Sequence, residues 1–174
     1  MQIFSEKLFR ELDKTKVKYL VVGGVACVLH GVVRLTRDLD LFVDLERDNL
    51  KKFLGVIKEM GYKPRVPVPI MDFADESKRK YWMQNKHMLV FSFYHPRNIY
   101  ETIDVFVYEP IKFETANRDR KVFNAKGTKI PVVSIRNLKK LKKLSGRPQD
   151  LADVKALEDI VKMEKGHGLK KKKK

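Results

Sequence analysis

The chain has 174 residues, of which 43% are hydrophobic and 34% are charged, which is enough for one buried core and a single domain. Its single cysteine, Cys27, excludes an intramolecular disulfide and a zinc site with several thiolate ligands. The sequence contains neither an apolar run of about 20 residues nor the pattern of a signal peptide. We therefore expect a cytoplasmic protein with no membrane partner.

Basic residues outnumber acidic ones by 38 to 22, which gives a formal charge of +16. A positive surface attracts the phosphates of nucleotides, RNA or DNA. Part of the surplus is the lysine run 170–174, which repels itself and buries nothing. We predict one domain over residues 1–165 and a disordered basic tail over 166–174. Whether this tail binds a partner or is only solvated stays open.

Hydrophobic periodicity predicts the elements of the first half of the chain. They are a helix at 4–14, a strand at 17–22, a short apolar helix at 25–30, a strand at 38–44 and a helix at 49–60. Gly31 and Gly61 follow two of the helices and are expected to end them. Three prolines, Pro64, Pro67 and Pro69, predict an extended loop over 63–73.

The second half begins with a weakly marked helix at 72–86 and is then rich in strands. We predict strands at 88–94 and 102–108, a hairpin of 121–124 and 129–133, and helices at 134–144 and 148–162. Pro148 suits the first turn of the last helix. Strands and helices do not alternate regularly, so the order predicts an α/β (α+β) domain with a mixed sheet.

Two aspartates, Asp38 and Asp40, lie two positions apart on a predicted strand. Residues with this spacing project from the same face, with Cα atoms roughly 6–7 Å apart. Two carboxylates this close repel each other unless a proton or a cation lies between them. Mg²⁺ prefers oxygen ligands and leaves positions for substrate phosphates. Because this short motif also arises by chance, it must be read with its neighbours.

Gly23 and Gly24 separate a β-prone run from a short helix. Glycines at such a turn let backbone N–H groups approach an anion at the helix N-terminus. The alternative is a tight turn that only requires small residues. The spacing matches neither G-x-G-x-x-G nor G-x-x-x-x-G-K-[ST], which excludes Rossmann and P-loop interpretations.

Asp104 lies in the apolar run 103–107, where a charge is costly unless it has a partner. If its strand lies beside that of Asp38 and Asp40, three acids converge on one site. The alternative is an aspartate on an edge strand that faces solvent.

Residues 23–41, Gly-Gly-Val-Ala-Cys-Val-Leu-His-Gly-Val-Val-Arg-Leu-Thr-Arg-Asp-Leu-Asp-Leu, resemble the signature of the nucleotidyltransferase superfamily, which has the DNA polymerase β-like fold. The similarity is greatest to the branch that contains the AbiEii-type toxins. Residues 142–153 resemble the last motif of that branch, a helical Lys followed by Gly-Arg and Asp-Leu-x-Asp. The two matches cover about residues 17–44 and 135–158, whereas residues 60–100 match nothing.

The resemblance implies a nucleotidyltransferase-like mixed sheet flanked by helices, and a transfer of a nucleoside monophosphate from an NTP that depends on Mg²⁺ or Mn²⁺. It implies that the catalytic and metal-binding residues are Asp38, Asp40 and Asp104. It also implies that the nucleotide is bound by Gly23, Gly24, Arg34, Thr36, Lys142 and Arg147, with Arg147 held by Asp150.

The partners are less defined than the reaction. The acceptor hydroxyl can belong to an RNA or tRNA end, a protein, an antibiotic or a small metabolite, and the NTP can be any of the four. The branch also implies a toxin–antitoxin component with an antitoxin partner. The competing hypothesis is a catalytically inactive module of the same fold that binds nucleic acid through its basic surface.

Several other residues have simpler structural interpretations. His30 in an apolar helix indicates a structural histidine, and Asp150 and Asp153 suit the start of a helix. An aromatic group is predicted to pack in the core, although it could stack on a base: Tyr81, Trp82, Phe91, Phe93 and Tyr94. The lysines of the helix at 134–144 indicate a solvated face or a surface for a polynucleotide.

Overall fold

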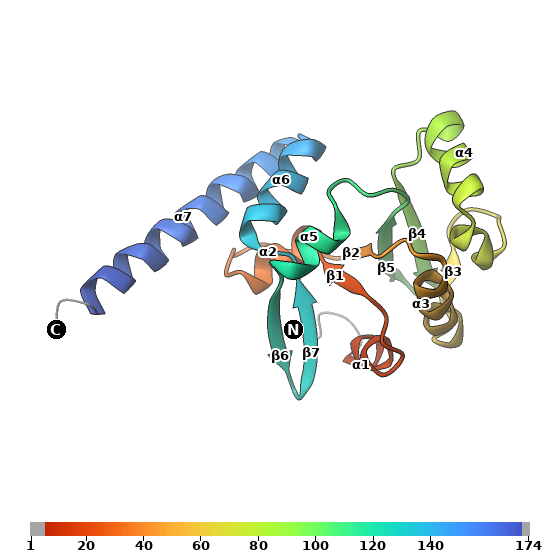
Figure 1. Cartoon of the computed structure of the whole chain (residues 1–174), viewed down its shortest axis with the longest axis horizontal. Helices are drawn as coiled ribbons and strands as arrows, with labels where there is room; N and C mark the ends of the chain where they lie inside the picture. Colours follow the sequence, from red (N-terminus) through yellow and green to blue (C-terminus); the bar gives the residue numbers. More distant parts are fainter. Residues whose placement is uncertain (1–5, 172–174) are drawn as a thin grey trace.

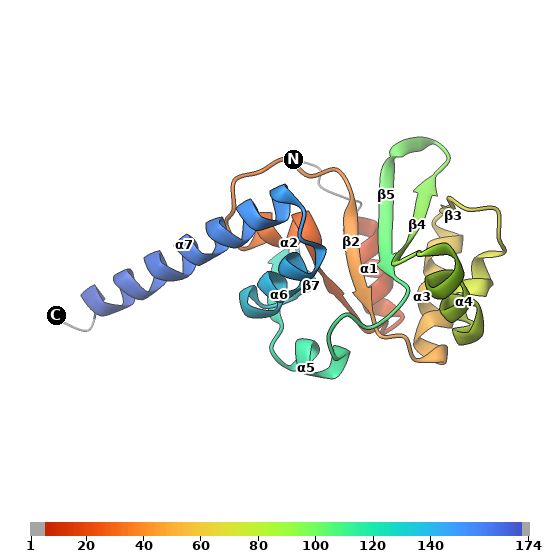
Figure 2. The same ribbon diagram turned by 90° about the horizontal axis from the view of Figure 1, so that it is seen from above.

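The computed structural model describes residues 6–171, which form one seven-stranded mixed sheet with helices around it (Figure 1 and Figure 2). The strands are β1 (Tyr19–Val21), β2 (Leu39–Val43), β3 (Lys63–Pro64), β4 (Val90–His95), β5 (Asn98–Phe106), β6 (Lys121–Ala125) and β7 (Thr128–Val132). Their order in the sheet is β3-β4-β5-β2-β1-β7-β6. The β2–β5 and β1–β7 pairs are parallel and the others antiparallel. The predicted α/β domain with a mixed sheet is confirmed.

The predicted helices occur in the expected order, together with two short ones, the 3₁₀ helix η1 (Ile70–Ala74) and α5 (Phe113–Arg118). The predicted ones are α1 (Glu6–Lys14), α2 (Gly23–Leu29), α3 (Arg47–Glu59), α4 (Glu76–Lys86), α6 (Ile135–Ser145) and α7 (Pro148–Lys171). The α1 helix packs against β7 and α3, whereas α2 packs against β2 and α6, and α6 packs against α7. In both views α7 projects away from the sheet (Figure 1 and Figure 2).

The structure differs from the predicted elements in three places. The segment 63–73, expected to be a loop, contains β3 and η1, and the short α5 was not predicted at all. The last helix runs to Lys171, beyond its predicted end at 162. Residues 1–5 and 172–174, which include parts of the first predicted helix and of the predicted basic tail, lie outside the described residues.

Aromatic packing holds β4 against η1 and α4. Phe91 and Phe93 of β4 are buried and contact Phe73 of η1, and Trp82 of α4 stacks on Phe91. The core interpretation is therefore confirmed for Trp82, Phe91 and Phe93, whereas Tyr81 is exposed. Because such aromatic contacts stabilise a core beyond the area they bury, they fix the strand that lies next to Asp104.

A buried asparagine fixes the other end of β2. The side-chain amide of Asn49, near the start of α3, donates to the carbonyl oxygens of Lys18 (3.0 Å) and Asp44 (2.8 Å) and accepts from the Lys18 N–H at 2.7 Å. Glu46 caps the same helix by accepting from two backbone N–H groups. These bonds hold β2 against β1 at its C-terminal end, while Asp40 lies near its start.

Candidate active site

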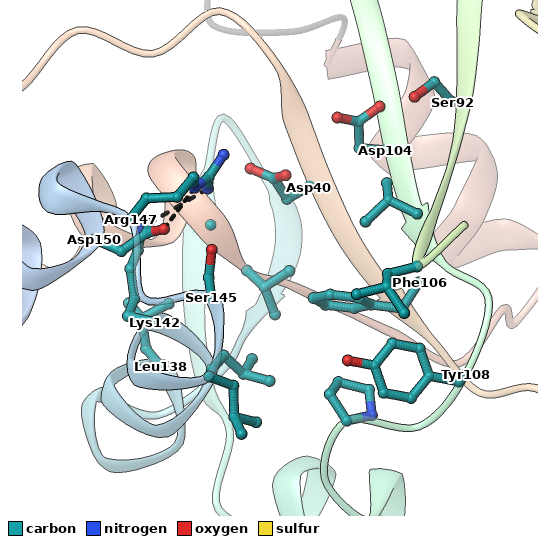
Figure 3. Close-up of a pocket in the computed structure, with 17 residues that line it drawn as sticks. Asp40, Ser92, Asp104, Phe106, Tyr108, Leu138, Lys142, Ser145, Arg147 and Asp150 are labelled. Carbon is teal, nitrogen blue, oxygen red and sulfur yellow. Dashed lines mark hydrogen bonds and ion pairs between the residues drawn. The ribbon is translucent and has the colours of Figure 1, made fainter. Parts of the chain in front are cut away.

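Asp40 and Asp104 occupy equivalent positions on two adjacent strands. In the parallel β2–β5 pair, Asp40 is the register partner of Asp104, so both side chains project from the same face of the sheet. The residues on either side of each aspartate are buried on the opposite face. Because β5 lies between β4 and β2, the alternative that Asp104 lies on an edge strand is wrong. Figure 3 shows the two carboxylates side by side.

The two carboxylates line a cavity of about 480 Å³ between the sheet and α6 (Figure 3). Its other polar lining comes from Ser92, Lys142, Ser145, Arg147 and Asp150. This volume lies within the range of small-molecule sites, about 300–1,000 Å³. The cavity can therefore hold a ligand in contact with both acids.

The carboxylate pair is electrostatically unfavourable as it stands. Burial, together with the charge of Asp104, raises the pKa of Asp40 to about 6, although the Gly24 N–H donates to Asp40 Oδ2 at 3.4 Å. Burial also raises the pKa of Asp104, against the opposing effect of Ser92. The Asp104 Oδ1 atom is buried and has no hydrogen-bond partner among the described residues. A site of this kind favours a proton or a cation.

Asp38 does not join the pair in the cavity. It precedes β2, is exposed, and is not part of the cavity lining, although its charge raises the pKa of both other acids. In residues 6–171 no group of three or more His, Cys, Asp or Glu side chains is arranged to hold a metal ion. The structure thus places two of the three predicted acids in the cavity lining, while Asp38 is exposed directly before β2 and close enough for its charge to act on both. Metal binding by Asp38 stays a prediction.

The two glycines are required by the close approach of other side chains. Gly23 has φ +61°, and a Cβ there would lie 1.9 Å from Asp40 Oδ2. A Cβ at Gly24 would lie 2.3 Å from Thr36 Oγ1. The turn therefore needs glycine for both its backbone conformation and its contacts. Binding of phosphate by these residues and by Thr36 stays a prediction.

The three predicted phosphate-binding cations are already paired with carboxylates. The Lys142 Nζ lies 2.7 Å from both Asp150 Oδ1 and Asp153 Oδ2, and Arg34 pairs with Asp153. The predicted contact of Arg147 with Asp150 is confirmed, at 2.6 Å from Nε to Oδ2.

These three cations differ in burial. The Lys142 side chain is 5% exposed, whereas that of Arg147 is 75% exposed. Although burial opposes it, hydrogen bonds from Arg147 and Lys142 hold the pKa of Asp150 well below its usual range. Asp150 and Asp153 are thus partners of buried cations rather than simple helix-start residues. Arg147 is the cation of this group that is best placed to meet a ligand.

Two further residues complete the description of the site. His30 is buried, and its Nε2 lies 2.8 Å from the carbonyl oxygen of Val133, which confirms its structural role. Ser92 of β4 is the register partner of Asp104 and lines the cavity, but sequence reasoning missed it. The signal was present, because the buried residues Phe91 and Phe93 flank it and alternation places it on the face of the carboxylates.

Several proteins of known structure are similar to this chain in fold. No family model and no curated protein matches the sequence. The lincomycin-bound lincosamide antibiotic adenylyltransferase LnuA superposes with a TM-score of 0.55 at 22% identity, over 90% of this chain and 98% of its own. ANT(2'')-Ia in complex with adenylyl-2''-tobramycin has a TM-score of 0.55 at 14% identity, over 94% and 90% of the two chains.

A third similar structure is an antigenic nucleotidyltransferase-like protein from Paracoccidioides brasiliensis, with a TM-score of 0.54 at 18% identity over 90% of this chain and 73% of that one. At such identities the similarity shows the fold alone. The chain has the nucleotidyltransferase fold, as its motifs predicted, while the AbiEii-type branch stays a prediction. None of the helices within residues 6–171 is long and apolar enough to cross a membrane.

Proposed function

We propose that this protein is a metal-dependent nucleotidyltransferase that moves a nucleoside monophosphate from an NTP to a hydroxyl acceptor. The observation that carries the proposal is the Asp40–Asp104 pair, which faces an open cavity with one buried carboxylate oxygen lacking a partner among the described residues. Oxygen ligands that repel each other suit Mg²⁺ or Mn²⁺. The fold shared with two antibiotic-modifying proteins supports the same reaction class.

Asp40 and Asp104 would hold the metal, with Asp38 at the surface beside them. When bound, the ion supplies positive charge to the phosphates and helps to align the reacting groups. The acceptor oxygen attacks the α-phosphorus, the bond to the pyrophosphate oxygen breaks, and the hydroxyl proton passes to the Asp104 carboxylate. Nucleotide binding is assigned to the predicted set: Gly23, Gly24, Arg34, Thr36, Lys142 and Arg147.

Transfer of label tests this proposal directly. The full chain is incubated with Mg²⁺, each α-³²P-labelled NTP, and cellular RNA, protein or small-molecule extract. We expect label to move to one acceptor class and the transfer to be lost in Asp40→Asn and Asp104→Asn. The matched control is Asp159→Asn, an exposed aspartate of α7, which retains transfer. Absence of transfer together with Mg²⁺-dependent NTP binding that Asp40→Asn leaves unchanged would contradict the proposal.

The basic surface supports a second candidate, an inactive module that binds nucleic acid. Lys140 and Lys143 of α6 are exposed, and the chain carries a net charge of +16. This candidate requires salt-dependent RNA or DNA binding that persists in Asp40→Asn and weakens when residues 170–174 are removed. A toxin–antitoxin role requires toxicity on expression that a neighbouring gene product relieves and Asp40→Ala abolishes.

A further inference from the structure

The cavity continues from the carboxylates into a region with two apolar walls. One wall consists of Leu89, Val90, Phe106 and Tyr108, which we call the β4–β5 wall, and the other is the leucine face of α6. Figure 3 shows Phe106 and Tyr108 across the cavity from Leu138 and Lys142. The side chains of Leu89 and Val90 are 51% and 38% exposed. Large apolar side chains gathered around a concave site are typical of a surface that binds an apolar group.

The charges of the lining argue against a cationic ligand. Its acids are Asp40, Asp104 and Asp150, and Asp150 is already engaged by Lys142 and Arg147. A polyamine would find only the carboxylate pair, which the proposed metal also uses. The chain's charge of +16 would in addition repel it. A strongly charged group of either sign would lose its hydration against the β4–β5 wall without a partner.

The position of the wall relative to the phosphate-binding residues indicates which substrate it meets. In the proposed reaction, the triphosphate lies on the side of Gly23 and Arg147. The attacking hydroxyl must approach the α-phosphorus opposite the leaving pyrophosphate, and therefore from the side of Asp104 and β5. We propose that the β4–β5 wall binds the acceptor, and that the acceptor is an uncharged hydroxyl compound with an apolar ring. This inference rests on the proposed function for the placement of the phosphates.

Three probes of different chemistry test the inference on the full chain by NMR of labelled methyl groups. The first is phenyl β-D-glucopyranoside, an uncharged compound with an apolar phenyl ring and a sugar that carries hydroxyls. The others are the polyamine tobramycin and the non-hydrolysable ATP analogue AMPCPP with Mg²⁺. We expect the glucoside to shift the methyl signals of Leu89 and Val90, and Leu89→Gln to weaken its binding about tenfold. The control is Leu151→Gln, because Leu151 is 53% exposed on α7 and lies outside the cavity lining. AMPCPP affinity should be unchanged in both variants.

Three outcomes would overturn the inference. The glucoside could fail to bind wild-type protein that binds AMPCPP, or tobramycin could bind in the cavity as well as the glucoside does. Alternatively, Leu89→Gln could weaken the binding of AMPCPP as much as the binding of the glucoside, which would assign the wall to the nucleobase instead. Failure of the proposed function is a separate result, namely the absence of Mg²⁺-dependent AMPCPP binding to wild-type protein.

Discussion

Replacement of Asp40 by asparagine tests the electrostatics of the site through folding stability. Burial and the charge of Asp104 raise the pKa of Asp40 from the ordinary value of 3.8 to about 6. Because the folded state binds this proton more tightly than the unfolded state, the wild-type protein loses stability as the pH rises from about 4 to about 6. At 1.36 kcal/mol per pKa unit, a shift of about two units amounts to about 3 kcal/mol. We expect Asp40→Asn to exceed wild type in unfolding free energy by about this amount at pH 8, and the difference to shrink towards zero near pH 4.

The measurement is urea unfolding between pH 4 and pH 8 in buffer without divalent ions. Asparagine has almost the same shape as aspartate, so the close contact with Gly23 is preserved. Asp159→Asn serves as the control, because Asp159 is exposed on α7 and lies outside the cavity lining. A variant that is no more stable than wild type at pH 8, or a difference that does not change with pH, would refute the reasoning.

The other predictions concern the groups around the pair. Lys142→Met leaves Asp150 and Asp153 with only their arginine partners, Arg147 and Arg34, so we expect a loss of about 1.5–3 kcal/mol in unfolding free energy, measured in urea; a loss below about 1 kcal/mol would contradict this role. Gly23→Ala forces a Cβ into Asp40 at positive φ, so we expect a cost of at least about 1 kcal/mol and weaker Mg²⁺-dependent NTP binding by calorimetry. Arg147→Gln removes an exposed guanidinium from the buried Asp150, which keeps its bond to Lys142, so stability should fall by less than about 1.5 kcal/mol, whereas NTP affinity should fall; unchanged affinity would exclude Arg147 from the nucleotide site.

The local features of this site could be predicted because they follow from short-range patterns. Alternation along β2 predicted a strand with Asp40 on one face, and the apolar run around Asp104 predicted a charge that needs a partner. The register that joins them depends on the pairing of strands about sixty residues apart, which periodicity does not specify. The resemblance to a known superfamily supplied that pairing, and the structure confirms it for Asp40 and Asp104.

The rest of the site depends on tertiary contacts that no local pattern records. Ser92 and the β4–β5 wall come from a segment of the chain without a recognisable motif, and only the packed sheet places them beside Asp104. The pairing of Lys142 with Asp153 depends on how α7 folds back against α6. Sequence reasoning therefore assigned Lys142 to the nucleotide and Asp153 to the start of a helix, and it predicted only the Arg147–Asp150 pair of this cluster.

The charged side chains of the site form two groups, one in which opposite charges are paired and one of two carboxylates without an ion pair. Lys142 and its two carboxylates form a buried cluster whose charges compensate one another, and Arg34 extends this cluster from the α2–β2 loop to α7. Buried pairs add little net stability, but breaking one is costly, so the cluster resists displacement of α6, α7 and the α2–β2 loop relative to one another. Asp40 and Asp104 face that wall without a direct ion pair among the described residues, although the charges of Lys142 and Arg65 lower their pKa values in part. Folding therefore leaves the two carboxylates with an uncompensated cost of burial and mutual repulsion. A ligand that supplies positive charge there relieves this cost, and the cavity does not have to reorganise first.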